Sequence, residues 1–421
     1  MQRSTTRYLF ATWPLLLGMG LLMLGAGLQG TLIGLRATID AFGVVATGAV
    51  MSCYYVGYIG GSICAPQLVQ RVGHIRVFAA LTSMASVIIL VQSMFVTPPL
   101  WALLRMASGF CFAGIYVVAE SWLNDRATNS NRGGVLALYM LVLYVGLGSG
   151  QFLLNLGDPA TATLFILVAV LISLAVVPMT LTVQRAPEFE IPHKIGLGEL
   201  YRASPMGVVG ITASGLVTSA LFSMGAVYAQ LIGLTAREIA TFMGVSIFAA
   251  VLTQLPIGRL SDRVDRRSVL SVVCLLAAAF AAAAAMFGES SRVLLYLLAA
   301  SFGGIALTLY SLSLSHVNDH LRPEQMVSAS AVVILMNGLG AVAGPLLVAA
   351  LMDVFGPAAY FGTLAALVGC LALYAIWRKG RRAPVAPEHK VKFVTSQPQA
   401  ASGQMVGAIV QNAAVARDDI H

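Results

Sequence analysis

The sequence predicts an all-α integral membrane protein with twelve transmembrane helices in two pseudo-symmetric six-helix halves. The composition is the first reason. Hydrophobic residues make up 58% of the 421 residues, charged residues make up 10%, and the mean hydropathy is +0.85, whereas a soluble domain carries about 25% charged residues. The second reason is a series of apolar runs of about 20 residues, the length that crosses a bilayer. The third is a charged segment, GRLSDRVDRR at 258–267. A second segment, PQLVQRVGHIR at 66–76, matches it in part.

Twelve apolar windows have the length and hydropathy of a membrane span. The first six lie at roughly 11–35, 44–68, 76–96, 99–122, 134–156 and 161–183. The second six lie at roughly 206–232, 239–258, 268–287, 292–316, 328–352 and 357–377. These windows divide the chain into an N-terminal half (1–183), a polar cytoplasmic linker (184–204), a C-terminal half (205–378) and a basic tail (379–421) whose composition predicts disorder.

We expect the chain to lie in the inner (plasma) membrane of a bacterium. The positions of lysine and arginine predict that both termini are on its cytoplasmic side. With that orientation only Arg36, Arg237 and Arg292 fall in outer loops, and the other basic residues between spans are cytoplasmic. The tryptophans fall at predicted span ends and are expected in the interfacial aromatic belt; they are Trp13, Trp101, Trp122 and Trp377.

The sequence gives no support for a metal, redox, nucleotide or nucleic-acid site. All five cysteines fall inside apolar runs, without CxxC or Cys/His spacing, so we expect buried small hydrophobic residues. No P-loop and no HExxH segment occurs. The net charge of +8 comes from short loops without a basic face interleaved with aromatic residues. We therefore expect no cofactor, no metal, no nucleic-acid partner and no enzymatic activity.

The two halves align beyond the charged segments. FAGIYVVAES at 112–121 matches FGGIALTLYS at 302–311, a shift of 190 residues, and the shift then becomes 194. The second shift pairs Asn124-Asp125 with Asn318-Asp319, Gly146 with Gly340, and Gly150 with Gly344. Such a repeat predicts a substrate site near the middle of the membrane, between the halves, that opens alternately to each side.

The segment 258–267 resembles the signature loop of the major facilitator superfamily, Gly-x-Leu-x-Asp-Arg-x-x-Arg-Arg, which in that family joins the second helix to the third and the eighth to the ninth. Arg105-Met-Ala-Ser-Gly109 resembles the second motif of the family. Gly340-Ala-Val-Ala-Gly344-Pro345 is similar to the glycine-proline motif of drug/proton antiporters, although the span-five copy ends in Gln151. RVGHIRVFAA, GIYVVAESWLND and RASPMGVVG are similar to an uncharacterised bacterial branch (the unknown-major-facilitator type). The resemblance covers roughly 8–378 and implies the fold and alternating-access mechanism of the family.

Glu120 is the only carboxylate well inside a predicted span. An ionisable group at that depth is a functional candidate, and burial would let it load and release a proton during transport. The alternative is a gate residue that pairs with Arg71, Arg76 or Arg132 near the cytoplasmic face.

Arg105 lies about six residues inside span four, where an arginine costs roughly 2.5–3.5 kcal/mol on insertion scales. The resemblance implies a position beside the cavity, for proton exchange or anion binding. The alternative is a guanidinium that satisfies backbone carbonyls of neighbouring helices. Glu120 is 15 residues away, about 22 Å along a helix, so the two cannot form a salt bridge.

The charged segment of the C-terminal half is expected to form a latch that holds one gate closed. Its members are Gly258, Asp262, Arg263, Arg266 and Arg267. In the first copy Gln70 replaces the aspartate and Pro66 the glycine, with Arg71 and Arg76 nearby. We expect this N-terminal latch to be weaker, or to use Glu120 or Asp125 as its acid.

Polar and aromatic residues inside the spans are candidates for the cavity lining. They are Gln29, Tyr54, Tyr58, Tyr116, Tyr144, Gln151, Tyr228, Gln230, Gln254, Tyr310 and Asn337. Each is also an ordinary candidate for an interhelical hydrogen bond. Gly146, Gly150, Gly340 and Gly344 are expected to pack helices closely or to control helix bending.

The sequence thus favours a secondary active transporter of a small organic solute, proton-coupled, with efflux by antiport preferred to uptake by symport. Its expected partners are the solute, a proton or ion gradient and the lipid bilayer, and the chain is expected to be monomeric. Two alternatives stay open: flipping of a lipid or lipid-linked substrate, and a non-transporting receptor or scaffold that uses the basic tail.

Overall fold

The computed structural model describes residues 2–126, 132–181 and 196–381, together with 390, 393, 395 and 396; side chains are described from 13 onward, without those of 124–126, 132–133, 323–324 and 326–328. Most of the predicted linker and tail therefore lies outside the described residues. The described chain contains helices and no strand, and twelve of its helical stretches are long and apolar enough to cross a membrane. The predicted all-α, twelve-span fold is confirmed.

The helices follow the predicted windows, with differences at the ends and two interruptions. The N-terminal half contains α1 (Gln2–Ile39), α2 (Val44–Val72), α3 (His74–Met94), α4 (Pro98–Arg126), α5 (Arg132–Phe152), η1 (Leu153–Leu156), α6 (Thr163–Leu174) and α7 (Val176–Thr180). The C-terminal half contains α8 (Leu197–Ala203), α9 (Pro205–Leu231), α10 (Ala236–Arg263), α11 (Arg266–Phe287), η2 (Gly288–Ser290), α12 (Arg292–Ala306), α13 (Leu309–Asn318), α14 (Pro323–Phe355) and α15 (Ala359–Lys379). The sixth span is thus divided into α6 and α7, and the tenth into α12 and α13.

Glycines bring equivalent helix pairs into contact in both halves. A Cβ atom added at Gly150 of α5 would lie 2.3 Å from the carbonyl oxygen of Leu24 in α1. A Cβ atom added at Gly344 of α14 would lie 2.3 Å from the carbonyl oxygen of Leu216 in α9. Gly146 and Gly340 make similar approaches to the same two partner helices. Because backbone atoms occupy the space that a side chain needs, these positions accept only glycine without a shift of the helices.

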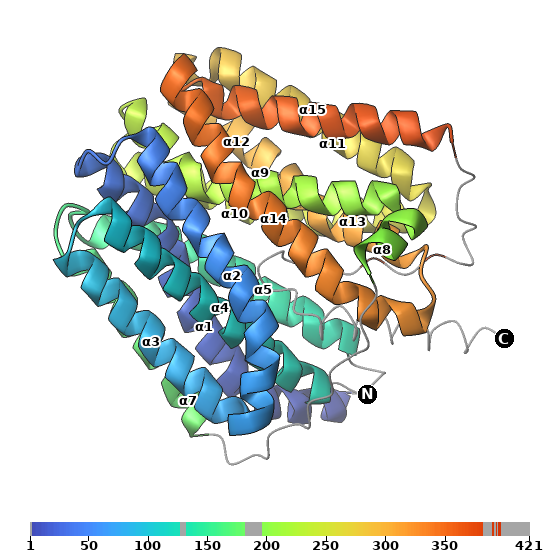
Figure 1. The fold of residues 1–421 in the computed structure, drawn as a ribbon, viewed down its shortest axis with the longest axis horizontal. Coiled ribbons are helices and arrows are strands. Elements are labelled where there is room, and N and C mark those ends of the chain that lie inside the picture. Colours follow the sequence, from blue (N-terminus) through green and yellow to red (C-terminus); the bar gives the residue numbers. More distant parts are fainter. Residues whose placement is uncertain are drawn as a thin grey trace.

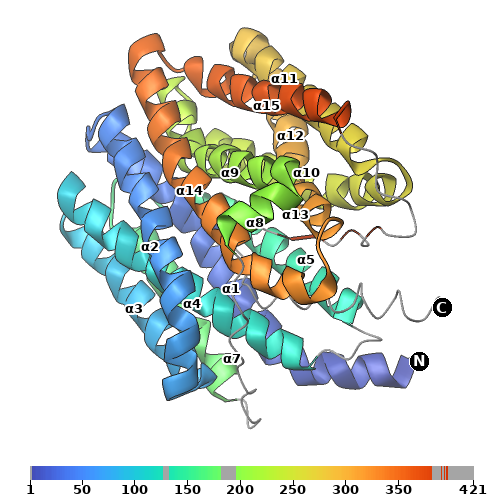
Figure 2. The same cartoon turned by 45° about the vertical axis from the view of Figure 1, so that its right-hand side comes forward.

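The two halves touch at one end of the molecule and separate towards the other (Figures 1 and 2). We call the end at which α2 ends and α14 begins the hinge face. At the opposite face Gly48 of α2 packs on Ala349 of α14, and Gly34 of α1 packs on Ser223 of α9. In both views α2 and α14 diverge from that contact towards the hinge face. The described state is therefore closed at the face opposite the hinges.

Large apolar side chains cover the outside of the bundle, as a lipid environment requires; Leu252 is 76% exposed and Leu373 66%. Trp13 and Trp377 are also exposed. The expectation that all four tryptophans form an interfacial belt is wrong for Trp101 and Trp122, which are buried. The indole of Trp101 instead donates hydrogen bonds to carbonyl oxygens at the end of α3.

Candidate solute site between the two halves

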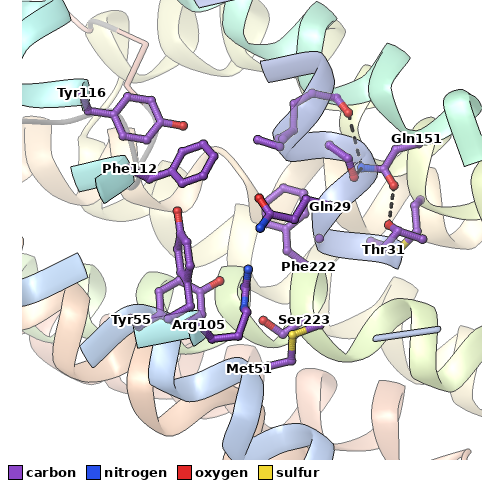
Figure 3. Close-up of a pocket in the computed structure, with 16 residues that line it drawn as sticks. Gln29, Thr31, Met51, Tyr55, Arg105, Phe112, Tyr116, Gln151, Phe222 and Ser223 are labelled. Carbon is purple, nitrogen blue, oxygen red and sulfur yellow. Dashed lines mark hydrogen bonds between the residues drawn. The ribbon is translucent and has the colours of Figure 1, made fainter. Parts of the chain in front are cut away.

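A cavity of about 70 Å³ lies between the halves, nearer the face opposite the hinges than the hinge face, and Figure 3 shows its lining. Its lining comes from α1, α2, α4 and α5 of the first half and from α9 and α10 of the second. The lining residues are Ala26, Gly27, Gln29, Gly30, Thr31, Met51, Tyr54, Tyr55, Arg105, Phe112, Tyr116, Leu147, Gln151, Phe222, Ser223 and Met243. The volume suffices for about two water molecules, whereas a ligand pocket holds roughly 300–1,000 Å³. A solute therefore needs the halves to move apart before it can be seated.

Arg105 projects from α4 into this cavity and is only 6% exposed. Its guanidinium carbon lies 4.4 Å from the centre of the Tyr54 ring, a cation–π contact, and the guanidinium points towards Gln29 (Figure 3). Its Nε atom is buried without a hydrogen-bond partner, and within the described part of the chain Arg105 forms no ion pair.

The Arg105–Gly109 motif holds the arginine in place by bringing α4 against α2. A Cβ atom at Gly109 would lie 1.8 Å from the carbonyl oxygen of Tyr54, and one at Gly57 would lie 1.7 Å from that of Met106. This reciprocal approach fixes α4 on α2 one turn from Arg105. The arginine is thereby held against the Tyr54 ring.

The two glutamines of the cavity differ in the number of hydrogen bonds that their side chains make with the protein. Gln151 accepts a hydrogen bond from the Thr31 hydroxyl and donates to the carbonyl oxygens of Gly27, at 2.9 Å, and Leu147, at 3.3 Å. It thus ties α5 to α1. Gln29 donates only a long hydrogen bond, 3.5 Å, to the hydroxyl of Ser108. Its amide remains available to an occupant of the cavity.

The other predicted lining residues are distributed over several sites. Tyr54 and Tyr116 line the cavity. Tyr144 of α5 and Gln254 of α10 form a hydrogen bond between the halves. Tyr58 and Asn337 border a second hollow of about 10 Å³, between the halves.

Three further candidates lie elsewhere in the C-terminal half. Tyr228 stacks on Tyr360, with ring centres 4.8 Å apart. Gln230 is partly buried near the end of α9, and Tyr310 is buried in α13.

Sequence reasoning missed several residues of the cavity wall, namely Thr31, Met51, Tyr55, Phe112, Phe222, Ser223 and Met243. Most are apolar residues in apolar spans, so no local signal separates them from lipid-facing neighbours. Thr31 is an exception, because it lies two residues after Gln29 in an otherwise apolar run.

Glu120 lies further along α4, nearer the hinge face, and is 1% exposed. The hydroxyl groups that interact electrostatically with its carboxyl group come from Tyr58, Tyr116 and Tyr139 in the N-terminal half and Tyr310 in the C-terminal half. Glu120 is therefore close to the interface between the halves. Arg71 and Arg76 are both exposed, and no ion pair joins either of them to Glu120 in the described structure; the side chain of Arg132 lies outside the described residues.

Arg266 is the centre of the C-terminal hinge between α10 and α11. It pairs with Asp262 at 3.0 Å and with Asp319, just after α13, at 3.2 Å. The side chains of Arg266 and Asp319 are each 2% exposed. Arg267 pairs with Asp265, which caps α11. Arg263 is exposed and takes part in none of the ion pairs among the described residues.

The N-terminal hinge between α2 and α3 has a different chemistry. His74, the first residue of α3, is 2% exposed and its Nε2 atom shares a hydrogen bond of 2.9 Å with the Ser121 hydroxyl. Gln70, Arg71 and Arg76 are exposed. The side chain of Asp125, the proposed substitute acid, lies outside the described residues.

Comparison with known proteins gives a consistent result. The sequence profile of the Major Facilitator Superfamily matches residues 15–250 and, in a second match, 207–413. An uncharacterized MFS-type transporter of Enterobacter sp. (strain 638) is 27% identical over 378 residues, which cover 89% of this chain and 97% of that protein. The uncharacterized MFS-type transporter YcaD of Escherichia coli O45:K1 is 28% identical over 386 residues, with the same coverage.

Solved structures share the fold at low sequence identity. The nucleoside transporter NupG superposes with a TM-score of 0.73 at 14% identity, over 87% of this chain and 98% of that chain. A bacterial homologue of the human lysosomal transporter Spinster, inward-facing and occupied, gives 0.70 at 15% identity, over 90% and 98%. The Escherichia coli fucose:proton symporter FucP gives 0.56 at 15% identity, over 88% and 99%.

Proposed function

The chain belongs to the major facilitator superfamily, a family of membrane transporters and not of enzymes, and we propose that it carries a small organic solute through the central cavity by alternating access. The observation that carries the proposal is a cavity lined from both halves, with a buried arginine and an available glutamine amide in its wall. The polar groups face inward and the exposed surface is apolar, which favours a small solute over a lipid. The protein is a multi-pass inner-membrane protein, and we propose that it works as a monomer.

The hinge face is the cytoplasmic face in this proposal. Lysine and arginine gather in the segments at that end, which is the orientation that the positive-inside rule favours. The state described above then opens towards the cytoplasm, with α1–α9 and α2–α14 contacts closing the outer side. The resemblance of Gly340–Pro345 to the antiporter motif supports export as the direction of transport.

Glu120 is the proposed coupling residue. Its carboxyl group is buried and interacts electrostatically with tyrosines of both halves, so its surroundings change when the halves move relative to each other. A change of surroundings between the two states alters the proton affinity of a buried carboxyl group, and this is the requirement for proton coupling.

Proteoliposomes with an imposed pH gradient and a pH-sensitive dye inside test the coupling. We expect solute-dependent proton movement with the wild-type protein, and none with Glu120→Gln, which keeps the shape of the side chain. Glu289→Gln changes an exposed acid at the opposite face and should leave proton movement unchanged. Undiminished proton movement with Glu120→Gln rules out this residue, and the absence of any solute flux in wild-type vesicles rules out the transport proposal.

A further inference from the structure

Arg105 is the only charged side chain among the residues that line the described cavity. It is almost fully buried, and none of the described residues supplies a carboxylate to neutralise it. A buried charge without a counter-ion destabilises a folded protein. The arrangement is therefore costly in the empty cavity and favourable when an anion enters.

The guanidinium is oriented for such an anion. Its central carbon lies over the Tyr54 ring, 4.4 Å from the ring centre, and the group points into the cavity towards Gln29 (Figure 3). An arginine stacked on an aromatic ring keeps the edge of its planar fork free, and that edge binds a carboxylate through two parallel hydrogen bonds. The Gln29 amide offers a further donor beside it.

The remaining walls fit an apolar body. Phe112 and Phe222 present rings to the cavity, and Met51 and Met243 present flexible thioether side chains. Building on the transport function proposed above, we propose that the solute is a small organic carboxylate. Its anionic group binds the edge of Arg105, and its apolar part packs against Phe112 and Phe222.

Thermal unfolding of the purified full-length protein tests this assignment, because a ligand stabilises the state that it binds. The probes are carboxylates paired with their neutral amides: phenylacetate with phenylacetamide, and hexanoate with hexanamide. We expect at least one carboxylate to raise the Tm of the wild-type protein while its amide does not. Arg105→Met should abolish the shift, and Arg237→Gln, which removes an exposed arginine, should preserve it.

Several outcomes overturn the carboxylate site. The first is that no carboxylate raises the Tm, and the second is that a carboxylate and its amide raise it equally. The third is a rise in Tm that persists in Arg105→Met. The fourth is a larger rise with inorganic phosphate or benzenesulfonate than with every carboxylate. Arg105→Met should also leave the Tm of the ligand-free protein unchanged or raise it; a fall would assign Arg105 a structural role and overturn the site. Transport of a neutral solute that is unaffected by Arg105→Met refutes the anion site alone, without refuting transport.

Three tail residues contact the C-terminal half at the hinge face, independently of the cavity. The Lys390 ammonium group donates to the carbonyl oxygen of Val264 at 2.7 Å, and the Phe393 backbone N–H donates to the carboxylate of Asp262 at 2.9 Å. The Ser396 N–H donates to the Ser311 hydroxyl, which donates to the Ser396 carbonyl oxygen, both at 2.9 Å.

The Phe393 ring occupies a place that the signature glycine leaves open. A Cβ atom added at Gly258 would lie 2.2 Å from that ring. Ser396 and Ser311 are both fully buried. Ser311 follows Tyr310, whose hydroxyl interacts electrostatically with Glu120 of the other half. The described tail residues thus contact both the hinge and α13.

We infer that Lys390, Phe393 and Ser396 form an autoinhibitory strap that holds the hinge face open. Closure at that face brings the hinge-face ends of α10 and α13 towards the N-terminal half, and the strap lies on these helices. Release of the strap therefore precedes closure.

Spin labels at Val72→Cys and Arg322→Cys, in a protein whose natural cysteines are replaced, report the separation of the halves by double electron–electron resonance. Deletion of 387–421 should increase the population with a short distance between the labels. Phe393→Ala should act in the same direction. Deletion of 397–421 keeps all three strap residues and should match the full-length protein. The strap proposal is overturned if the two deletions give identical distance distributions, or if deletion of 387–421 leaves the distribution of the full-length protein unchanged.

Discussion

The two hinges occupy equivalent positions in the repeat, but their described contacts are made by different residues. In the C-terminal half, Arg266 joins Asp262 and Asp319 through two ion pairs, one of which is almost fully buried. In the N-terminal half, the position equivalent to Arg266 is His74, whose Nε2 atom shares a hydrogen bond with the Ser121 hydroxyl.

The turns themselves also differ in length. The N-terminal turn has one residue between helices, Gly73, with φ of 93° and ψ of 155°. The C-terminal turn has two, Val264 and Asp265, both with negative φ. Glycine tolerates backbone angles that other residues avoid, and this tolerance allows the shorter turn.

Removal of the central arginine should have the largest effect. Arg266→Met leaves the buried carboxylate of Asp319 without its partner, so we expect a loss of about 3–5 kcal/mol in the free energy of unfolding. Thermal unfolding in detergent measures it. The double variant Arg266→Met with Asp319→Asn should recover part of the loss. If the free energy of unfolding falls by less than a single neutral hydrogen bond contributes, the C-terminal hinge does not depend on its charges.

The glycine turn comes next. Gly73→Ala forces an L side chain into a backbone conformation that only glycine adopts readily, at a cost of about 1–3 kcal/mol. Val264→Ala is the matched change in the other hinge, where the side chain is 45% exposed; its effect should stay within about 0.5 kcal/mol. Equal effects of the two variants on the unfolding temperature would contradict the difference between the turns.

The hydrogen bond between His74 and Ser121 should contribute less. Ser121→Ala removes one hydrogen bond of the buried His74 imidazole, and we expect a loss of about 1 kcal/mol. Ser311→Ala, the equivalent change in the C-terminal half, removes contacts to Ser396 only, so it should loosen the tail and change the unfolding temperature less. The opposite ranking would mean that the tail contact stabilises the fold.

Restoring the lost acid should have the smallest effect. Gln70→Asp places a carboxylate on an exposed position, where an ion pair contributes about 0.2–1 kcal/mol. We expect a small shift in the balance between open and closed states, detected with the same spin labels. Gln70→Asp combined with His74→Arg recreates the charged pair of the other half and should shift the balance further. If neither variant shifts this balance, the residues at positions 70 and 74 do not influence the equilibrium between the open and closed states.

The sequence predicted the parts of this molecule that local patterns encode. The twelve spans, the repeat and the charged hinge follow from hydropathy, spacing and motif. Arg105 stood out because a charge inside an apolar span is rare. Among the tyrosines proposed for the lining, Tyr54 lines the cavity, whereas Tyr58 borders another hollow.

The rest depends on how helices distant in the sequence are rotated against each other. Phe222 and Met243 resemble any other apolar residue of a span until α9 and α10 are placed beside α1 and α5. The tail contacts could not be anticipated either, since Lys390, Phe393 and Ser396 lie in a polar segment without periodicity. Their partners, Val264, Asp262 and Ser311, come from two different helical regions.

The uncompensated charge of Arg105 has an electrical consequence. A unit charge that crosses a full 100 mV membrane potential changes its energy by about 2.3 kcal/mol, and a charge held inside the membrane senses a part of it whenever the accessible side changes. The empty carrier holds one positive charge at that depth, so its reorientation should respond to voltage. Once an anion is bound the pair is neutral, and the same movement proceeds with little influence from the membrane potential.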